Sequence, residues 1–133
     1  MATGRSNKLT GQIAEHLVCA ELGRRGLLAT PFAGNVPNFD IIVADERLAT
    51  LPIQVKASNS DNWPTDARLW MDLRLDVETG IQHYYGPSTV RDGHLIYVCV
   101  ALRPPDTEHR DRFFILTKAE VQAACVASYT PWM

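Results

Sequence analysis

Residues 39–58 read FDIIVADERLATLPIQVKAS, and this stretch decides the fold that the sequence predicts. Two apolar runs, 39–44 and 51–57, flank a short polar turn around residues 45–47. Short runs rich in β-branched residues on either side of a turn are typical of an antiparallel hairpin. Asp40 is the single charge in the first run. Gln54 and Lys56 are the polar residues that interrupt the second.

These three polar residues are predicted to share one face of the hairpin. Successive side chains of a strand point to opposite faces, so Gln54 and Lys56 lie on the same side. A turn centred near Arg47 places Asp40 opposite Gln54. A carboxylate, a carboxamide oxygen and a lysine therefore converge at one edge of the predicted sheet. Oxygen ligands suit a hard cation such as Mg²⁺, and a lysine adds positive charge where water and phosphate gather.

Upstream of the hairpin, residues 7–25 are predicted to form a helix, capped by Ser6 or Asn7 and closed by Gly26. Its apolar residues fall on two arcs, which predicts a helix that is mostly buried. Glu15 lies beside small and apolar residues of this helix. If that surface packs on the sheet, the Glu15 carboxylate is directed toward the metal site.

The rest of the chain completes a mixed α/β order. The expected elements are a strand at 27–32, a loop at 58–66, a strand or irregular segment at 67–75, a short helix within 76–93 before Gly86-Pro87, a central strand at 94–102, a strand at 112–116 and a helix at 118–128. Thr117 and Glu120 form a capping box for the last helix. Helices packing on a central mixed sheet, in one domain over residues 1–133, are therefore predicted.

The composition indicates which class of protein the chain belongs to. The chain has 133 residues, 46% of them hydrophobic and 21% charged, as is ordinary for a globular domain. No run approaches the roughly 20 apolar residues that span a bilayer. The first residues also lack a secretory signal, so a cytoplasmic location is expected. The chain ends at Met133, soon after the closing helix, which leaves further C-terminal sequence open.

Other residue types carry weaker signals. The net charge of −2 speaks against stable, sequence-independent binding of nucleic acid, but less against an enzyme. The cysteines have no paired spacing and are predicted to be core thiols, and the four histidines have no ligand spacing. Ser58 either supports the site or opens the following loop. The aromatic residues of the middle segment are predicted to pack on the core rather than to stack on bases, and they are Trp63, Trp70, Tyr84 and Tyr85.

Taken together, a helix with Gly11-x-x-x-Glu15, an Asp at a strand start and a strand reading Gln-Val-Lys resemble the PD-(D/E)XK, or restriction-endonuclease-like, nuclease superfamily. The resemblance covers residues 8–58 well, and the remainder by compatible element order. It implies a core of αβββαβ type. It also implies that Asp40, position 54 and the carbonyl of Val55 bind Mg²⁺ or Mn²⁺, with Glu15 as accessory acid and Lys56 as catalytic lysine.

One departure from the pattern matters. Position 54 is Gln rather than an acid, so it can ligate a metal without contributing negative charge. The first hypothesis is a metal-dependent endonuclease that hydrolyses nucleic acid, most readily DNA, and by analogy acts as a homodimer. The second is a degenerate nuclease fold that binds DNA or a protein without hydrolysis. A third is an interaction scaffold in a mobile-element, defence or toxin–immunity system.

Overall fold

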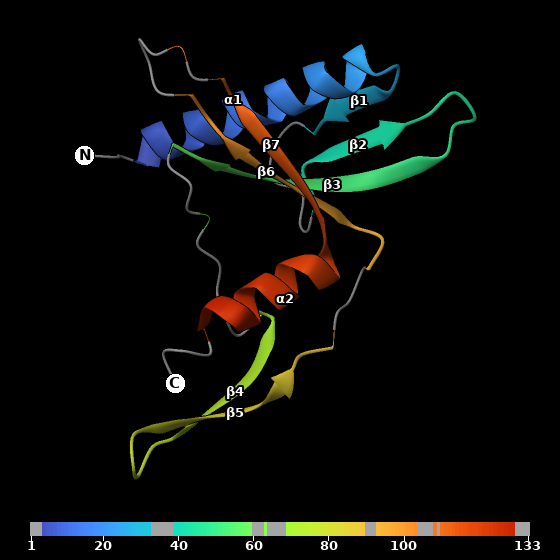
Figure 1. Ribbon diagram of the computed structural model, residues 1–133. Coiled ribbons are helices and arrows are strands. Elements are labelled where there is room, and N and C mark those ends of the chain that lie inside the picture. Colours follow the sequence, from blue (N-terminus) through green and yellow to red (C-terminus); the bar gives the residue numbers. More distant parts are fainter. Residues whose placement is uncertain are drawn as a thin grey trace.

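The computed structural model describes residues 4–32, 39–59, 63, 69–89, 93–103, 108 and 110–129, with side chains from residue 8 onward. Its helices and strands follow the chain as shown in Figure 1. They are α1 (Gly4–Arg24), β1 (Leu28–Pro31), β2 (Ile41–Ala44), β3 (Thr50–Ser58), β4 (Met71–Asp76), β5 (Ile81–Pro87), β6 (Ile96–Ala101), β7 (Arg112–Thr117) and α2 (Lys118–Tyr129).

The main sheet is mixed and has the strand order β1-β2-β3-β6-β7. β1, β2 and β3 pair antiparallel, β3 pairs parallel with β6, and β6 pairs antiparallel with β7. β6 is the central strand that its sequence predicts, because five of its six residues are buried. A mixed sheet flanked by helices, predicted from the sequence, is therefore confirmed.

The hairpin of β2 and β3 has the predicted register. Ile41 pairs with Ile53, and Ala44 pairs with Thr50, so the turn spans residues 45–49. The Asp45 carboxylate accepts hydrogen bonds from the backbone amides of Arg47 and Ala49, both at 2.9 Å. This local side-chain cap fixes the turn, and with it the pairing of the two strands.

Helix α1 departs from two predictions. It begins at Gly4, before the caps predicted at Ser6 or Asn7, and it ends at Arg24, close to the expected Gly26, whose φ is +85°. The prediction that it is mostly buried was wrong, since Leu9 is 56% exposed and Ile13 is 43% exposed. The cause is that α1 packs on one layer alone, over β1, β2 and β3. The apolar arc that holds Leu9 and Ile13 lies outside that contact.

The segment at 76–93 was predicted to hold a short helix, and this was wrong. Residues 81–87 form β5, which pairs with β4 in a hairpin separate from the main sheet. The Asp76 carboxylate accepts hydrogen bonds from the amides of Glu78 and Thr79, and Gly80 takes a φ of +70°. These residues close a tight turn. An αβββαβ order has its second helix after the third strand. At that point of the chain, the described residues form the β4–β5 hairpin instead.

The hairpin of β4 and β5 packs on α2, away from the main sheet (Figure 1). A second core of Trp70, Met71, Leu95 and Tyr97 joins the two parts. The Gln122 side chain donates hydrogen bonds to the carbonyls of Trp70, at 2.8 Å, and Ser88, at 2.7 Å. The predicted capping box of α2 is confirmed by reciprocal bonds between Thr117 and Glu120, both at 3.1 Å.

The predictions for single side chains are confirmed for some residues and wrong for others. Cys99 is buried, as predicted, whereas Cys19 and Cys125 are partly buried at the edges of the two cores. Trp70 and Tyr84 pack in the second core, but Tyr85 is 59% exposed, against the prediction. Within the described part of the chain, no helix is long and apolar enough to cross a membrane.

Candidate functional site

Asp40 lies directly before β2, where this strand meets β3. Its backbone amide donates a hydrogen bond to the carbonyl of Ile53, at 2.8 Å. Its carboxylate oxygen Oδ2 accepts a hydrogen bond from the backbone amide of Val55, also at 2.8 Å. The register of the two strands ends at the pair of Ile41 and Ile53, directly after Asp40. The carboxylate is therefore fixed against the Gln-Val-Lys strand.

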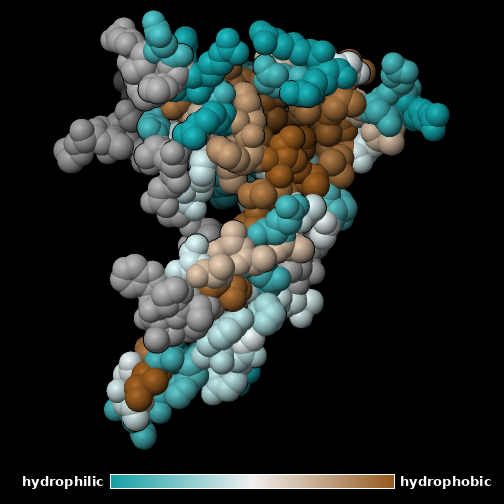
Figure 2. Space-filling view, in the orientation of Figure 1, coloured by the Kyte–Doolittle hydropathy of each residue, from teal (hydrophilic) through white to brown (hydrophobic). Residues whose placement is uncertain are grey.

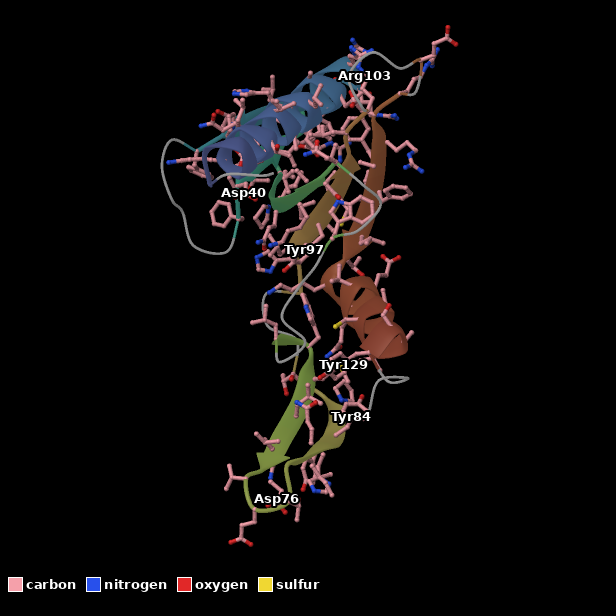
Figure 3. All side chains as sticks on the ribbon, turned by 90° about the vertical axis from the view of Figure 1, so that its left-hand side faces the viewer. Asp40, Asp76, Tyr84, Tyr97, Arg103 and Tyr129 are labelled. Carbon is pink, nitrogen blue, oxygen red and sulfur yellow. The ribbon has the colours of Figure 1, made fainter. Side chains whose placement is uncertain are left out.

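Glu15 comes to the same place from helix α1. Burial raises the pKa of the Glu15 carboxyl, and the negative charge of Asp40 raises it further, while His16 acts in the opposite direction. Glu15 in turn raises the pKa of the Cys19 thiol, which burial already raises. Two carboxylates from distant parts of the sequence thus lie within electrostatic reach of one another. Figure 3 shows Asp40 close to α1 and far from Asp76 at the hairpin tip.

Gln54 and Lys56 project from the face of the main sheet away from α1, which we call the distal face. The alternate residues Ile53 and Val55 belong to the core beneath α1. Strand alternation therefore turns Gln54 and Lys56 to the other side. Both side chains are partly exposed, and among the described residues no hydrogen bond or ion pair of either side chain is found. The Asp40 carboxylate is hydrogen-bonded to the strand that carries both residues and lies within electrostatic reach of Glu15.

The donors fit a hard divalent cation better than a softer transition metal. Two carboxylates that repel one another, and the carboxamide of Gln54 on the adjacent strand β3, are oxygen ligands of the kind that Mg²⁺ accepts. A cation between them offsets the repulsion that raises the pKa of Glu15. No group of three or more His, Cys, Asp or Glu suited to a metal occurs among the described residues. This follows from Gln at position 54, which leaves two acids.

Sequence reasoning overlooked the neighbours of Lys56 on the distal face. The parallel pairing of β3 with β6 places Tyr97 beside Gln54 and Cys99 beside Lys56. Lys56 lowers the pKa of the Cys99 thiol against the larger, opposite effect of burial. Nothing in the sequence gives the register of two strands that are forty residues apart, so these neighbours emerge only from the fold. Ser58, on the same face, is buried.

Comparison with known proteins bears on the fold. No family model matches the chain, and neither does any curated protein. Among solved structures, the chain is similar to the bacterial homing endonuclease I-Ssp6803I. The match has a TM-score of 0.55 and 19% sequence identity, and it covers 89% of this chain and 73% of that one. The mixed sheet with its flanking helices is therefore a fold shared with a nuclease.

Proposed function

We propose that this protein is a metal-dependent endonuclease that hydrolyses phosphodiester bonds in DNA. The observation that carries the proposal is the fixed position of the Asp40 carboxylate, bound to the Val55 amide and within electrostatic reach of Glu15. The similarity in fold to a homing endonuclease supports nucleic acid as the substrate. Membership of the PD-(D/E)XK superfamily, as a single domain over residues 1–133, is part of the same proposal.

In this proposal, Asp40, Gln54, the carbonyl of Val55 and Glu15 hold Mg²⁺, for which Mn²⁺ can substitute. The bound cation supplies the Lewis acidity that hydrolysis of a phosphodiester needs. Asp40 and Glu15 supply the negative charge, and the Gln54 amide supplies a neutral oxygen. Because Asp40 is held by a backbone hydrogen bond, its carboxylate needs little reorganisation to bind the cation.

In the proposed reaction, Lys56 acts on the phosphate and on the attacking water. Its ammonium group lies on the distal face, one residue beyond the Val55 carbonyl and on the same side as Gln54. There it stabilises the negative charge that builds on the phosphoryl oxygens, and it orients the attacking water. The partial exposure of Lys56 leaves room for a phosphate beside it. A homodimer, with one site for each strand, fits cleavage of a duplex.

Gln54 favours a second candidate function. With two acids in place of three, the site has less negative charge to retain a cation. A nuclease fold that binds DNA, or a protein partner, without cutting it is consistent with that donor set. Calorimetry with Mn²⁺ separates the two candidates. Absence of binding at millimolar Mn²⁺ favours the second candidate, and saturable binding favours the endonuclease.

Cleavage of plasmid and oligonucleotide DNA with Mg²⁺ or Mn²⁺ tests the proposal directly. Asp40→Ala and Lys56→Ala are each expected to lower the rate by about 100-fold or more. Arg47→Ala is the matched control, because Arg47 is an exposed cation in the turn between β2 and β3. Its rate is expected to equal that of the wild type. Equal rates in all four proteins contradict the proposal.

A further inference from the structure

A row of side chains runs across the distal face from Lys56 to the edge of the main sheet. In register, Lys56 pairs with Cys99 of β6, and Cys99 pairs with Phe114 of β7. Phe113 packs in the core beneath α1, so Phe114 points to the distal face. Neighbouring strands lie about 4.8 Å apart, which places the backbone of Phe114 roughly 10 Å from that of Lys56.

The far end of this row is an aromatic surface. Phe114 is 41% exposed although it belongs to a strand of the main sheet. Trp63 lies edge-to-face against it, with ring centroids 5.6 Å apart. The indole nitrogen of Trp63 donates a hydrogen bond to the carbonyl of Val100, at 3.3 Å, which fixes the ring. The Arg112 guanidinium lies over the Phe114 ring, 5.9 Å from its centroid.

Helix α2 leaves this surface open. It follows β7 directly and covers the neighbouring row, where Leu116 and Tyr97 join the second core. Phe114 lies two residues before Leu116, beyond the end of that cover. Figure 2 shows hydrophobic side chains gathered over the main sheet in the region of β7. An exposed ring, a fixed indole and a guanidinium thus lie in line with a lysine.

We propose that Trp63, Phe114 and Arg112 form a stacking site for an unpaired base next to the phosphate that Lys56 binds. Bases stack on aromatic rings and on guanidinium planes whatever their sequence. The span between Lys56 and Phe114 is one that a single nucleotide bridges. A base can occupy the surface only when it is out of the duplex, so the preferred substrate is DNA with an unpaired base beside the scissile phosphate. The inference rests on the proposed function, because it takes the phosphate at Lys56 as its reference.

A second aromatic and cationic pair on the molecule lacks these properties. In the β4–β5 hairpin, the Arg74 guanidinium lies 4.4 Å from the centroid of the exposed Tyr85 ring. Arg74 is paired there with Asp72, and the hairpin turn carries Asp76 and Glu78. The carboxylate paired with Arg74, and those in the turn of the same hairpin, disfavour a phosphate there. Tyr85 is therefore a control residue of the same chemical kind, placed where no nucleotide is expected.

Binding without cleavage tests the inference. The probe is a fluorescein-labelled oligonucleotide of ten thymidines, and its anisotropy is followed in EDTA with the full chain. Phe114→Leu, which keeps an apolar side chain but removes the ring, is expected to weaken binding by roughly fivefold to 100-fold. Phe114→Tyr keeps the ring and is expected to bind as the wild type does. Tyr85→Leu is also expected to leave binding unchanged.

Three outcomes overturn the stacking site. They are no binding of the oligonucleotide by the wild type, binding by a folded Phe114→Leu variant within twofold of the wild type, and an equal loss in Tyr85→Leu. Thermal unfolding of each variant shows that it is folded. Plasmid cleavage with Mg²⁺ is measured separately. If the wild type cleaves DNA but Phe114→Leu binds and cleaves equally well, the stacking site fails alone. If binding follows the ring but nothing cleaves, the endonuclease proposal fails alone.

Discussion

The carboxylate of Asp40 accepts a hydrogen bond from the backbone amide of Val55, at 2.8 Å, across the hairpin of β2 and β3. This bond ties the acid to the peptide unit between Gln54 and Val55. The same peptide unit precedes the carbonyl to which we assign a metal bond. The Asp40 side chain therefore has two roles. It holds the start of β2 against β3, and it supplies negative charge to the proposed metal site.

Asp40→Asn separates these two purposes. The carboxamide oxygen of Asn can still accept the hydrogen bond from the Val55 amide, so the free energy of unfolding is expected to fall by less than about 1 kcal/mol. The lost charge is expected to weaken Mn²⁺ binding by about tenfold or more. Calorimetry and chemical unfolding measure the two effects. A large loss of stability with unchanged Mn²⁺ affinity contradicts the assignment.

Glu15→Gln is expected to stabilise the metal-free protein at neutral pH. The pKa of Glu15 is raised above its usual value of 4.5, so the ionised form is disfavoured in the folded state. Below pH 4.5 the group is protonated in both states and costs nothing. The cost develops as the pH rises from 4.5 toward the raised folded pKa, and it is complete once the pH lies above that folded pKa.

The expected gain is small because Glu15 is only partly buried. After allowance for solvent screening, it is about 0.5 kcal/mol at pH 7. Thermal unfolding in EDTA at pH 7 and at pH 4 checks the sign, since the difference between Glu15→Gln and the wild type is expected to vanish at the lower pH. Mn²⁺ affinity is expected to fall in the same variant. A variant less stable than the wild type at pH 7 contradicts this account.

Much of the candidate site could be predicted because its information is local. The alternation in Gln54-Val55-Lys56 fixes which side chains share a face, and the short turn after Ala44 fixes the pairing of Ile41 with Ile53. Both depend on residues close in sequence. The direction of Glu15 depends on how α1 packs, and the sequence suggested it only through the apolar neighbours of that residue.

The errors have a shared physical cause. The β4–β5 hairpin packs on α2 and is anchored to it by the hydrogen bonds from Gln122 to the carbonyls of Trp70 and Ser88. No short-range pattern reports a contact between residues so far apart. The exposed arc of α1 was misjudged for a similar reason. The apolar spacing shows that Leu9 and Ile13 lie on the same side of the helix. It does not show whether another element packs on that side.

Gln54→Glu restores the acid that the superfamily pattern expects. The new carboxylate belongs to the residue before Val55, whose amide binds Asp40, so Mn²⁺ affinity is expected to rise by about tenfold. The same proximity of like charges is expected to lower the stability of the metal-free protein. Calorimetry and thermal unfolding in EDTA measure both effects. Gln82→Glu, in the exposed hairpin, is the control that adds the same charge elsewhere. Unchanged affinity in Gln54→Glu places position 54 outside the metal site.

Gln122 is expected to matter for the fold rather than for the reaction. Its amide nitrogen binds the carbonyls of Trp70 and Ser88, which lie at the start and the end of the β4–β5 hairpin. Gln122→Leu leaves both carbonyls without this donor in a partly buried place, at a cost of about 2 kcal/mol in urea unfolding. Gln82→Ala removes an exposed hydrogen bond and is expected to cost less than about 0.5 kcal/mol. Equal costs in the two variants contradict the view that Gln122 anchors the hairpin to α2.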